Sequence, residues 1–259
     1  MNGSAANCPS YNRLSLMTKL QAEQRRLYLT QDATPEDSGL IDAQGQVRAM
    51  VVAVAQPAGW DAVAALCQGI QDALDLPTPA IAVSGGAGFQ VWLSLAEPVS
   101  VVHAQAFLAA LCRRFLSNVP ARHVQCLPWV EPSAALAARH ASLVPALQGA
   151  TGRWSAYVAP GLASMFADEP WLDVPPGIDA QAQLLCRLES ISVADFARAK
   201  MELGLEDAPA HAAMPDGGLG ATTVPASSET DPRRFLLAVM NDPAVEMRLR
   251  IEAAKALLP

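Results

Sequence analysis

The sequence predicts an α+β fold: a mixed, partly antiparallel sheet flanked by helices, followed by a C-terminal helical hairpin. Two observations carry this prediction. Short apolar segments with the character of strands alternate with helical segments, but without the regular period of a doubly wound parallel fold. Two connections, 42–45 and 85–88, have the composition of hairpin turns, and such turns join antiparallel strands.

The first half of the chain supplies helices and three strands. Residues 10–27 have the pattern of an amphipathic helix. The apolar run 51–55, closed by Pro57, is typical of a buried central strand. Helical spacing continues over 60–74, and strands are expected at 79–84 and 89–95.

The second half is expected to contain further helices and two strands. A helix over 101–116 places Ala104, Phe107, Leu108, Leu111 and Phe115 on its inward face. The remaining predicted elements are a strand at 123–127, a short helix at 133–139, a strand at 154–158 and helices at 179–188 and 193–203.

We predict three parts along the chain. Residues 1–203 form the α+β domain. Residues 204–231 are rich in Gly, Pro, Ala, Ser and Thr without an apolar period, which is typical of a flexible linker. Residues 232–259 read as two helices that are too short to hold a core alone, so we expect them to dock on the domain or on a protein partner.

Composition excludes several classes of protein. The chain has 18 Lys and Arg against 25 Asp and Glu, a net charge of −7, and 51% hydrophobic residues. These values argue against disorder over most of the length and against a protein that grips nucleic acid by charge alone. No apolar run is long enough to span a membrane, no secretory signal is recognised, and the five cysteines lack the spacing of a metal site or a disulfide framework. We therefore expect a cytoplasmic protein without a membrane partner.

The sharpest local feature is the segment Ser84-Gly85-Gly86-Ala87-Gly88. Its glycines permit a tight turn and close approach of a ligand to the backbone, and exposed amides in such a turn can hold a phosphate. The segment is not a Walker A loop, because no Gly-Lys-Ser/Thr follows, and it does not precede a helix as a dinucleotide fingerprint does. A purely structural hairpin turn is the alternative.

The run IAVSGGAGFQVWLSLAEPVS resembles the signature hairpin of the archaeo-eukaryotic primase superfamily, and is most similar to the primase-like domain of TOTE conflict systems. The resemblance extends over about residues 45–195. It implies a primase core, which is RRM-like, with an ancestral nucleotide cleft. Matching positions in the hairpin are Ser84, Gly86, Gly88, Trp92, Glu97, Pro98 and Val99. Nucleotide or phosphate contacts are implied at Ser84, Gly85, Gly86, Gly88, Gln90 and Arg153.

The catalytic positions of that family are replaced here. Alignment of the apolar strand places Ala55 and Pro57 where the family has two metal-binding acids, and Gln90 where it has a histidine. The third acidic position should fall within 123–126, which has no carboxylate. Because Mg²⁺ needs hard oxygen ligands, the resemblance argues against polymerase chemistry, and we expect no catalytic residue, metal or cofactor.

Two other groups of residues are candidates for a site. His123 beside Arg122, with Arg113 and Arg114 on the preceding helix, could form a basic patch near the cleft or simply a solvated helix end. Relocated carboxylates for Mg²⁺ or Mn²⁺ could come from Asp42, Asp61 and Glu97, although Asp61 suits the first turn of a helix without any metal role.

Three hypotheses follow. The first is a non-catalytic primase-fold protein that binds nucleotide or nucleic acid, or a protein partner through 232–259. The second is an active metal-dependent nucleotidyltransferase or hydrolase with relocated carboxylates. The third is an assembly protein with no nucleotide ligand. The tail resembles helical segments of small-terminase packaging proteins of bacteriophages, which implies an origin in a mobile element.

Overall fold

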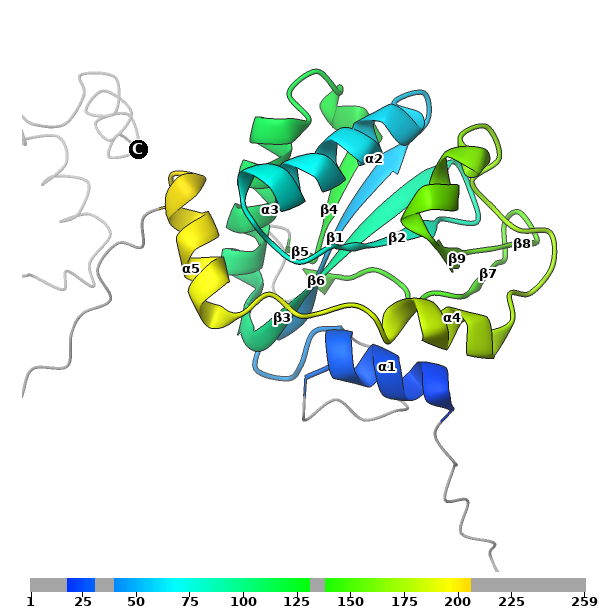
Figure 1. The fold of residues 1–259 in the computed structure, drawn as a ribbon, viewed down its shortest axis with the longest axis horizontal. Coiled ribbons are helices and arrows are strands. Elements are labelled where there is room, and N and C mark those ends of the chain that lie inside the picture. The colour runs from blue at the N-terminus through cyan, green and yellow to red at the C-terminus, as the bar shows by residue number, and fades with distance from the viewer. Residues whose placement is uncertain (1–17, 31–39, 131–137, 206–259) are drawn as a thin grey trace, which may run out of the picture. The chain divides into compact units, whose positions relative to one another are not determined.

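The computed structural model describes residues 18–30, 40–130 and 138–205 (Figure 1). The helical hairpin predicted at 232–259, nearly all of the predicted linker, and residues 10–17 of the first predicted helix lie outside the described residues.

A five-stranded antiparallel sheet forms the centre of the domain. The strand order is β4-β1-β3-β2-β9, and every neighbouring pair is antiparallel. Helix α2 connects β1 to β2, and helix α3 connects β3 to β4, which gives the split β-α-β arrangement shared by RRM-like and ferredoxin-like folds. The predicted α+β class is confirmed. The bounds are β1 Gln46–Ala55, α2 Gly59–Gln68, β2 Ala80–Val83, β3 Gly88–Ser100, α3 Val101–Phe115, β4 Val124–Leu127 and β9 Ala156–Val158.

One face of the sheet holds the larger hydrophobic core. Alternate residues of the central strands, among them Val52, Val54, Phe89 and Val91, are fully buried against α2, α3 and α5 (Val193–Glu202). Alternation along a strand sends every second side chain to this face, and the β-branched and aromatic residues at these positions suit a buried sheet surface. We call it the α2/α3 face.

The opposite face is covered in part by α1 (Lys19–Tyr28) and α4 (Ile178–Leu185), which lie side by side beneath the sheet in Figure 1. We call it the α1/α4 face. Trp92 of β3 packs there against Tyr28 and Tyr157, with ring centroids 5.1 and 6.1 Å away. Burial raises the pKa of both tyrosines, so their hydroxyls stay neutral.

Strand β9 at the sheet edge is capped by a side chain of α4. The buried amide of Gln181 accepts a hydrogen bond from the Tyr157 backbone amide (2.7 Å) and donates one to the Tyr157 carbonyl (2.9 Å). Gln181 thus supplies the donor and the acceptor that another strand would offer, and the edge is closed to further pairing at this residue.

Several boundaries differ from the prediction. Helix α1 begins at Lys19, because Thr18 has extended backbone angles and caps the helix through a reciprocal bond with Gln21. Strand β3 does not end at 95 but continues to Ser100. The register against β1 shifts between Val47 and Ala49, and an irregularity of this kind tolerates Pro98 within a strand.

Two expected elements are replaced by short paired segments. The predicted helix 133–139 is wrong at its end, since β6 (Ala138–Arg139) pairs with β5 (Trp129–Val130). The predicted strand 154–158 is divided: β8 (Arg153–Trp154) pairs with β7 (Leu147–Gln148), whereas β9 joins the main sheet. The structure adds the short helices η1 (Gly69–Ala73, π), η2 (Ala121–His123, 3₁₀) and η3 (Pro160–Phe166, 3₁₀).

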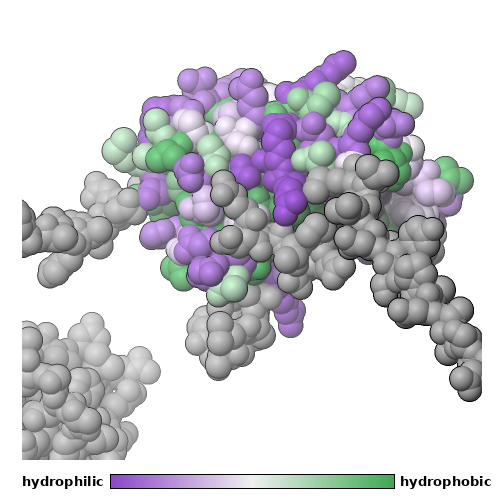
Figure 2. Space-filling view, turned by 90° about the horizontal axis from the view of Figure 1, so that it is seen from below, coloured by the Kyte–Doolittle hydropathy of each residue, from purple (hydrophilic) through white to green (hydrophobic). Residues whose placement is uncertain are grey.

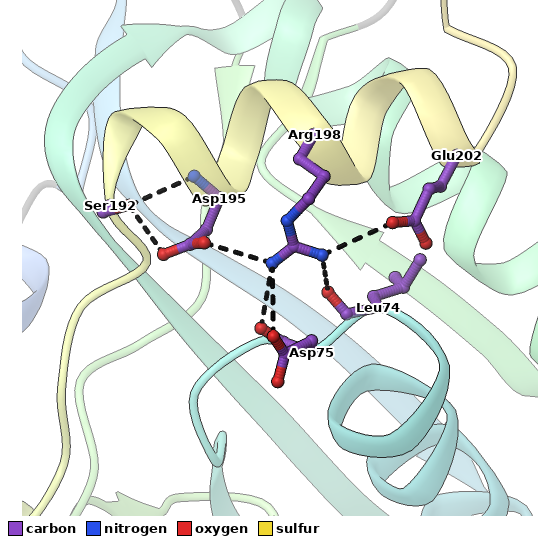
Figure 3. A network of polar contacts seen from close by, with 6 residues as sticks. All are labelled: Leu74, Asp75, Ser192, Asp195, Arg198 and Glu202. Carbon is purple, nitrogen blue, oxygen red and sulfur yellow. Dashed lines mark hydrogen bonds and ion pairs between the residues drawn. The ribbon is translucent and has the colours of Figure 1, made fainter.

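Helix α5 is fastened to the end of η1 by one guanidinium group (Figure 3). Arg198 donates hydrogen bonds to the carbonyls of Leu74 (2.7 Å) and Asp75 (3.1 Å) and pairs with Asp195 (3.1 Å) and Glu202 (3.4 Å) on its own helix. A single planar group with five donors can satisfy all of these acceptors at once.

We expect Gln181→Ala to lower the free energy of unfolding by about 2–3 kcal/mol, because it leaves a buried N–H and a buried carbonyl without partners. The matched control is Gln183→Ala, an exposed position on the same helix, which should change stability by less than about 0.5 kcal/mol. Urea unfolding followed by circular dichroism measures both. Equal effects of the two substitutions would contradict the capping role of Gln181.

Asp195 predicts a dependence of stability on pH. The Ser192 hydroxyl first, and then Arg198, lower the pKa of its carboxyl group. Its contribution to stability is therefore fully present above the unfolded pKa of about 3.9 and is lost as the pH falls through the lower folded value. Asp195→Asn should reduce the urea midpoint at pH 7, and the difference from wild type should shrink towards pH 2–3. In a Ser192→Ala background the effect at pH 7 should be smaller; an undiminished effect would argue against this cause.

Candidate functional site

Three paired residues form a row across the sheet near the end of β1. Ala53 pairs with Gln90 of β3 on one side and with Gln125 of β4 on the other. Directly opposed residues of antiparallel strands project to the same face, and Gln90 is two residues from Trp92, which is buried on the α1/α4 face. The two glutamine side chains therefore stand on the α1/α4 face, separated by the small side chain of Ala53.

A hydrogen bond fixes the orientation of Gln90. The indole N–H of Trp92 donates to Oε1 of Gln90 (3.0 Å), and the indole itself is held in the aromatic cluster. Because the amide oxygen is engaged, the NH₂ group is the part of Gln90 that remains to donate to a ligand.

A cavity of about 460 Å³ lies over this row. Its floor is formed by side chains of the sheet, and the segment 139–148 forms its wall. The volume lies in the range of small-molecule sites. The lining residues are Ser84, Gln90, Gln125, Leu127, Arg139, His140, Ala141, Ser142, Val144, Gln148 and Ser155.

The wall of the cavity is held by hydrogen bonds from two directions. The Ser155 hydroxyl accepts from the Ala146 amide (2.8 Å) and donates to the Ala146 carbonyl (3.2 Å). From α1, the buried Gln24 side chain donates to the Val144 carbonyl (2.7 Å). These bonds fix the backbone of the wall at two points, so the cavity is largely preformed.

A second, smaller cavity adjoins the first and shares Ser84 and Gln125 with it. Arg122 and His123 line it, so this half of the predicted basic patch does lie at the site. Arg114 does not take part in it, since it donates to the Glu202 carbonyl at the end of α5 (3.1 Å).

The two cavities together have a distinct charge character. Among the described residues that line them there is no Asp or Glu, whereas two arginines and two histidines are present. The chain as a whole carries seven more acidic than basic residues. Figure 2, which looks at the molecule from the side of α1, shows hydrophobic residues scattered among hydrophilic ones in its coloured part. Because arginines line the two cavities and no described lining residue is acidic, the cavities are a locally cationic, polar region of an acidic protein.

Three backbone amides of the glycine-rich hairpin already donate hydrogen bonds to other groups of the protein. The Ser84 hydroxyl accepts hydrogen bonds from the amides of Gly86 and Gly88 (3.1 Å each), and the Gly85 amide donates to the Pro170 carbonyl (3.2 Å). Gly85 has a positive φ of 73°, which glycine adopts without strain. These bonds account for the three glycines as parts of a turn, without any phosphate.

The residues implied in phosphate or nucleotide contact are thus not all brought together. Ser84 and Gln90 line the larger cavity, and Gly88 lines the smaller one. Gly85 and Gly86 line neither, nor does Arg153, whose guanidinium stacks on Trp171 at 3.6 Å and lies 3.9 Å from the Asp173 carboxylate.

Of the positions at which the resemblance predicts catalytic residues, Ala55 and Gln90 line the cavities and Pro57 does not. Ala55 is the last residue of β1 and pairs with Gly88, Pro57 follows the strand, and Gln90 and Gln125 flank Ala53. Gln125, Arg139, His140 and Ser155 were not predicted from the sequence. Gln125 lies within 123–126, where the resemblance places the third acidic residue. Arg139 is the last residue of the helix predicted at 133–139, and that pattern gives no indication of a site.

The alternative carboxylates do not converge. Asp42 caps the turn before β1, where it accepts from the amides of Gln44 and Gln46, and Glu97 lies near the same end of the strand. Asp61 is in the first turn of α2, beyond the opposite end of β1. The strand is ten residues long, about 30 Å, which is too far for shared metal ligands. Within residues 18–30, 40–130 and 138–205, no group of three or more His, Cys, Asp or Glu is placed to hold a metal ion.

Comparison with known proteins adds no relative. No family model matches the chain, and no curated protein matches it. The resemblance to the primase superfamily therefore stays a prediction that rests on the hairpin residues. No helix in the described part of the chain is long and apolar enough to cross a membrane.

The structural role of the hairpin glycines can be tested with a matched pair. A Cβ on Gly88 would overlap the Val54 carbonyl oxygen on the neighbouring strand, whereas a Cβ on Gly86 would meet only the Ser84 hydroxyl at 3.7 Å. We expect Gly88→Ala to lower the free energy of unfolding by about 3 kcal/mol and Gly86→Ala by less than about 1 kcal/mol. Thermal and urea unfolding measure the difference. Equal costs would show that the close approach of β1 and β3 is not the constraint at Gly88.

Proposed function

We propose that this chain is a non-catalytic binding module that holds a nucleotide, free or within a single strand of nucleic acid, in the two adjoining cavities around Gln90 and Gln125. The observation that carries the proposal is the chemistry of the lining. Amides and hydroxyls form the floor, arginines and histidines lie at the sides, and no acidic side chain is present among the described lining residues.

The floor is suited to the edge of a base. A glutamine amide combines a donor and an acceptor at the spacing that base edges present, and proteins read unpaired bases by hydrogen bonds to those edges. Gln125 offers both groups, and Gln90 offers the donor that Trp92 leaves available. The two glutamine amides can recognise a base, and neither of them is a general base or a nucleophile.

The sides of the cavities are suited to the phosphate. Arg139 and His140 come from the wall, and Arg122 and His123 come from η2. Arginine pairs with phosphate oxygens through parallel hydrogen bonds, and this interaction needs no Mg²⁺. The small number of cations and the net charge of −7 favour one nucleotide or a short single strand over a long duplex.

The RRM-like order of the sheet supports the proposal only in general terms, because this fold carries many functions. The primase origin, the mobile-element setting and a protein partner for residues 232–259 remain predictions, the last because these residues lie outside the described part of the chain.

The test is an isosteric change of the floor. Gln90→Glu keeps an oxygen acceptor for the Trp92 indole but replaces the NH₂ donor with a charged acceptor. We expect it to weaken binding of nucleoside monophosphates, or of a labelled single-stranded oligonucleotide, at least 10-fold in buffer containing EDTA. Gln183→Glu, an exposed site on α4, makes the same charge change away from the cavities and should leave the affinity within about 2-fold.

Calorimetry with the four nucleoside monophosphates and fluorescence anisotropy with the oligonucleotide measure the affinities. Absence of binding by the unaltered chain in both measurements would overturn the proposal. Incorporation of labelled nucleotides that stops on addition of EDTA would also overturn it, in favour of an active metal-dependent enzyme.

A further inference from the structure

Two cysteines from different elements lie in contact on the α2/α3 face. Cys112 is in the last turn of α3 and Cys126 is in β4, and their Sγ atoms are 3.4 Å apart. Both thiols are free and both residues are partly exposed. The separation exceeds a disulfide bond by about 1.4 Å, since an S–S bond is about 2.05 Å long. A small relative movement of α3 and β4 would therefore allow a bond to form.

The surroundings permit that movement. Strand β4 has four residues and lies at an edge of the sheet, where it pairs only with β1 among the described strands. Cys112 is close to the C-terminus of α3, which ends at Phe115. Neither sulfur is therefore held between two rigid strands, and edge strands and helix ends are the parts of a fold that shift at least cost.

We propose that Cys112 and Cys126 are a redox-active pair that forms a reversible intramolecular disulfide on exposure to a low-molecular-weight disulfide such as glutathione disulfide. The bond fastens the edge strand β4 to α3. This proposal is independent of nucleotide binding, because it rests on the two sulfur atoms and on the position of β4.

The exchange reaction balances with glutathione disulfide as the oxidant. The Cys126 thiolate attacks one sulfur of glutathione disulfide, the S–S bond of the reagent breaks, and a glutathione thiolate leaves. The Cys112 thiolate then attacks the Cys126 sulfur in the mixed disulfide and releases a second glutathione. Two protein thiols are oxidised, one glutathione disulfide is reduced to two glutathione molecules, and the two thiol protons pass to solvent or to the departing thiolates.

The pair itself favours Cys126 as the first nucleophile. A hydrogen bond from the Cys112 thiol lowers the pKa of Cys126, whereas the same contact and burial raise the pKa of Cys112. The thiolate is the reactive form of cysteine, so the sulfur with the lower pKa attacks first. Once it has reacted, Cys112 is already in position to resolve the mixed disulfide.

The test uses the full chain equilibrated in a series of reduced and oxidised glutathione mixtures. Samples are quenched with acid, alkylated, digested and analysed by mass spectrometry. We expect a peptide linked through Cys112 and Cys126, formed without dimerisation and removed by excess reduced glutathione. Oxidation should slow amide hydrogen exchange over 122–128 several-fold and raise the midpoint of thermal unfolding by roughly 5–10 °C.

Matched variants separate the pair from the other cysteines. Cys112→Ser and Cys126→Ser should each abolish the linked peptide, whereas Cys186→Ser, at an exposed position, should leave it unchanged. The peptide map of the unaltered chain decides the question even if a serine variant folds poorly. Persistence of free thiols at both sites in the most oxidising mixture, or a disulfide that instead involves Cys67 or Cys186, would overturn the proposal.

Discussion

The pairing of β1 with β3 is the constraint on which the rest of the structure depends. Its register brings Ala55 against Gly88 and Ala53 against Gln90, and it leaves no space for a side chain at Gly88. A slip of one residue would turn one of the two strands over relative to the other, and would exchange the faces of that strand. If β3 turned over, Phe89 would leave the core and Gln90 would enter it. The same pairing therefore sets the hydrophobic core on one side of the sheet and the polar cavity floor on the other.

Local patterns predicted most of the elements but not their assembly. The apolar run 51–55, the turn at 42–45 and the inward residues of α3 could be recognised because each follows from the periodicity of a few neighbours. The order of the strands could not be read in this way, since it depends on crossovers that skip a strand. The division of 154–158 into two paired segments, and the continuation of β3 through Pro98, arise from tertiary contacts and a change of register that the local sequence does not signal.

The candidate site shows the same limit. Ser84 and Gln90 could be identified from the hairpin, because glycines and a tryptophan mark the segment. Gln125 and His140 could not, because they are unremarkable in sequence and gain meaning only when β4 and the segment 139–148 are placed around Gln90. Arg153 shows a different limit: the resemblance implies a ligand contact there, but the residue lines neither cavity and its guanidinium stacks on Trp171. The overall acidity of the chain also gave no indication of a site lined by cationic and neutral side chains.

The attachment of α1 has a consequence for the order of events during synthesis. Gln24 bonds to Val144, 120 residues later, and Arg26 bonds to the carbonyls of Leu185 and Leu188, 159 and 162 residues later. The helix thus leaves the ribosome before the central strands, yet the carbonyls of Leu185 and Leu188 do not exist until the last part of the domain has been made. Contacts of such long sequence separation close late. The helix that holds the cavity wall at Val144 gains these anchors only then, so an incomplete chain can contain the central sheet and still lack a fastened α1 beside the cavity.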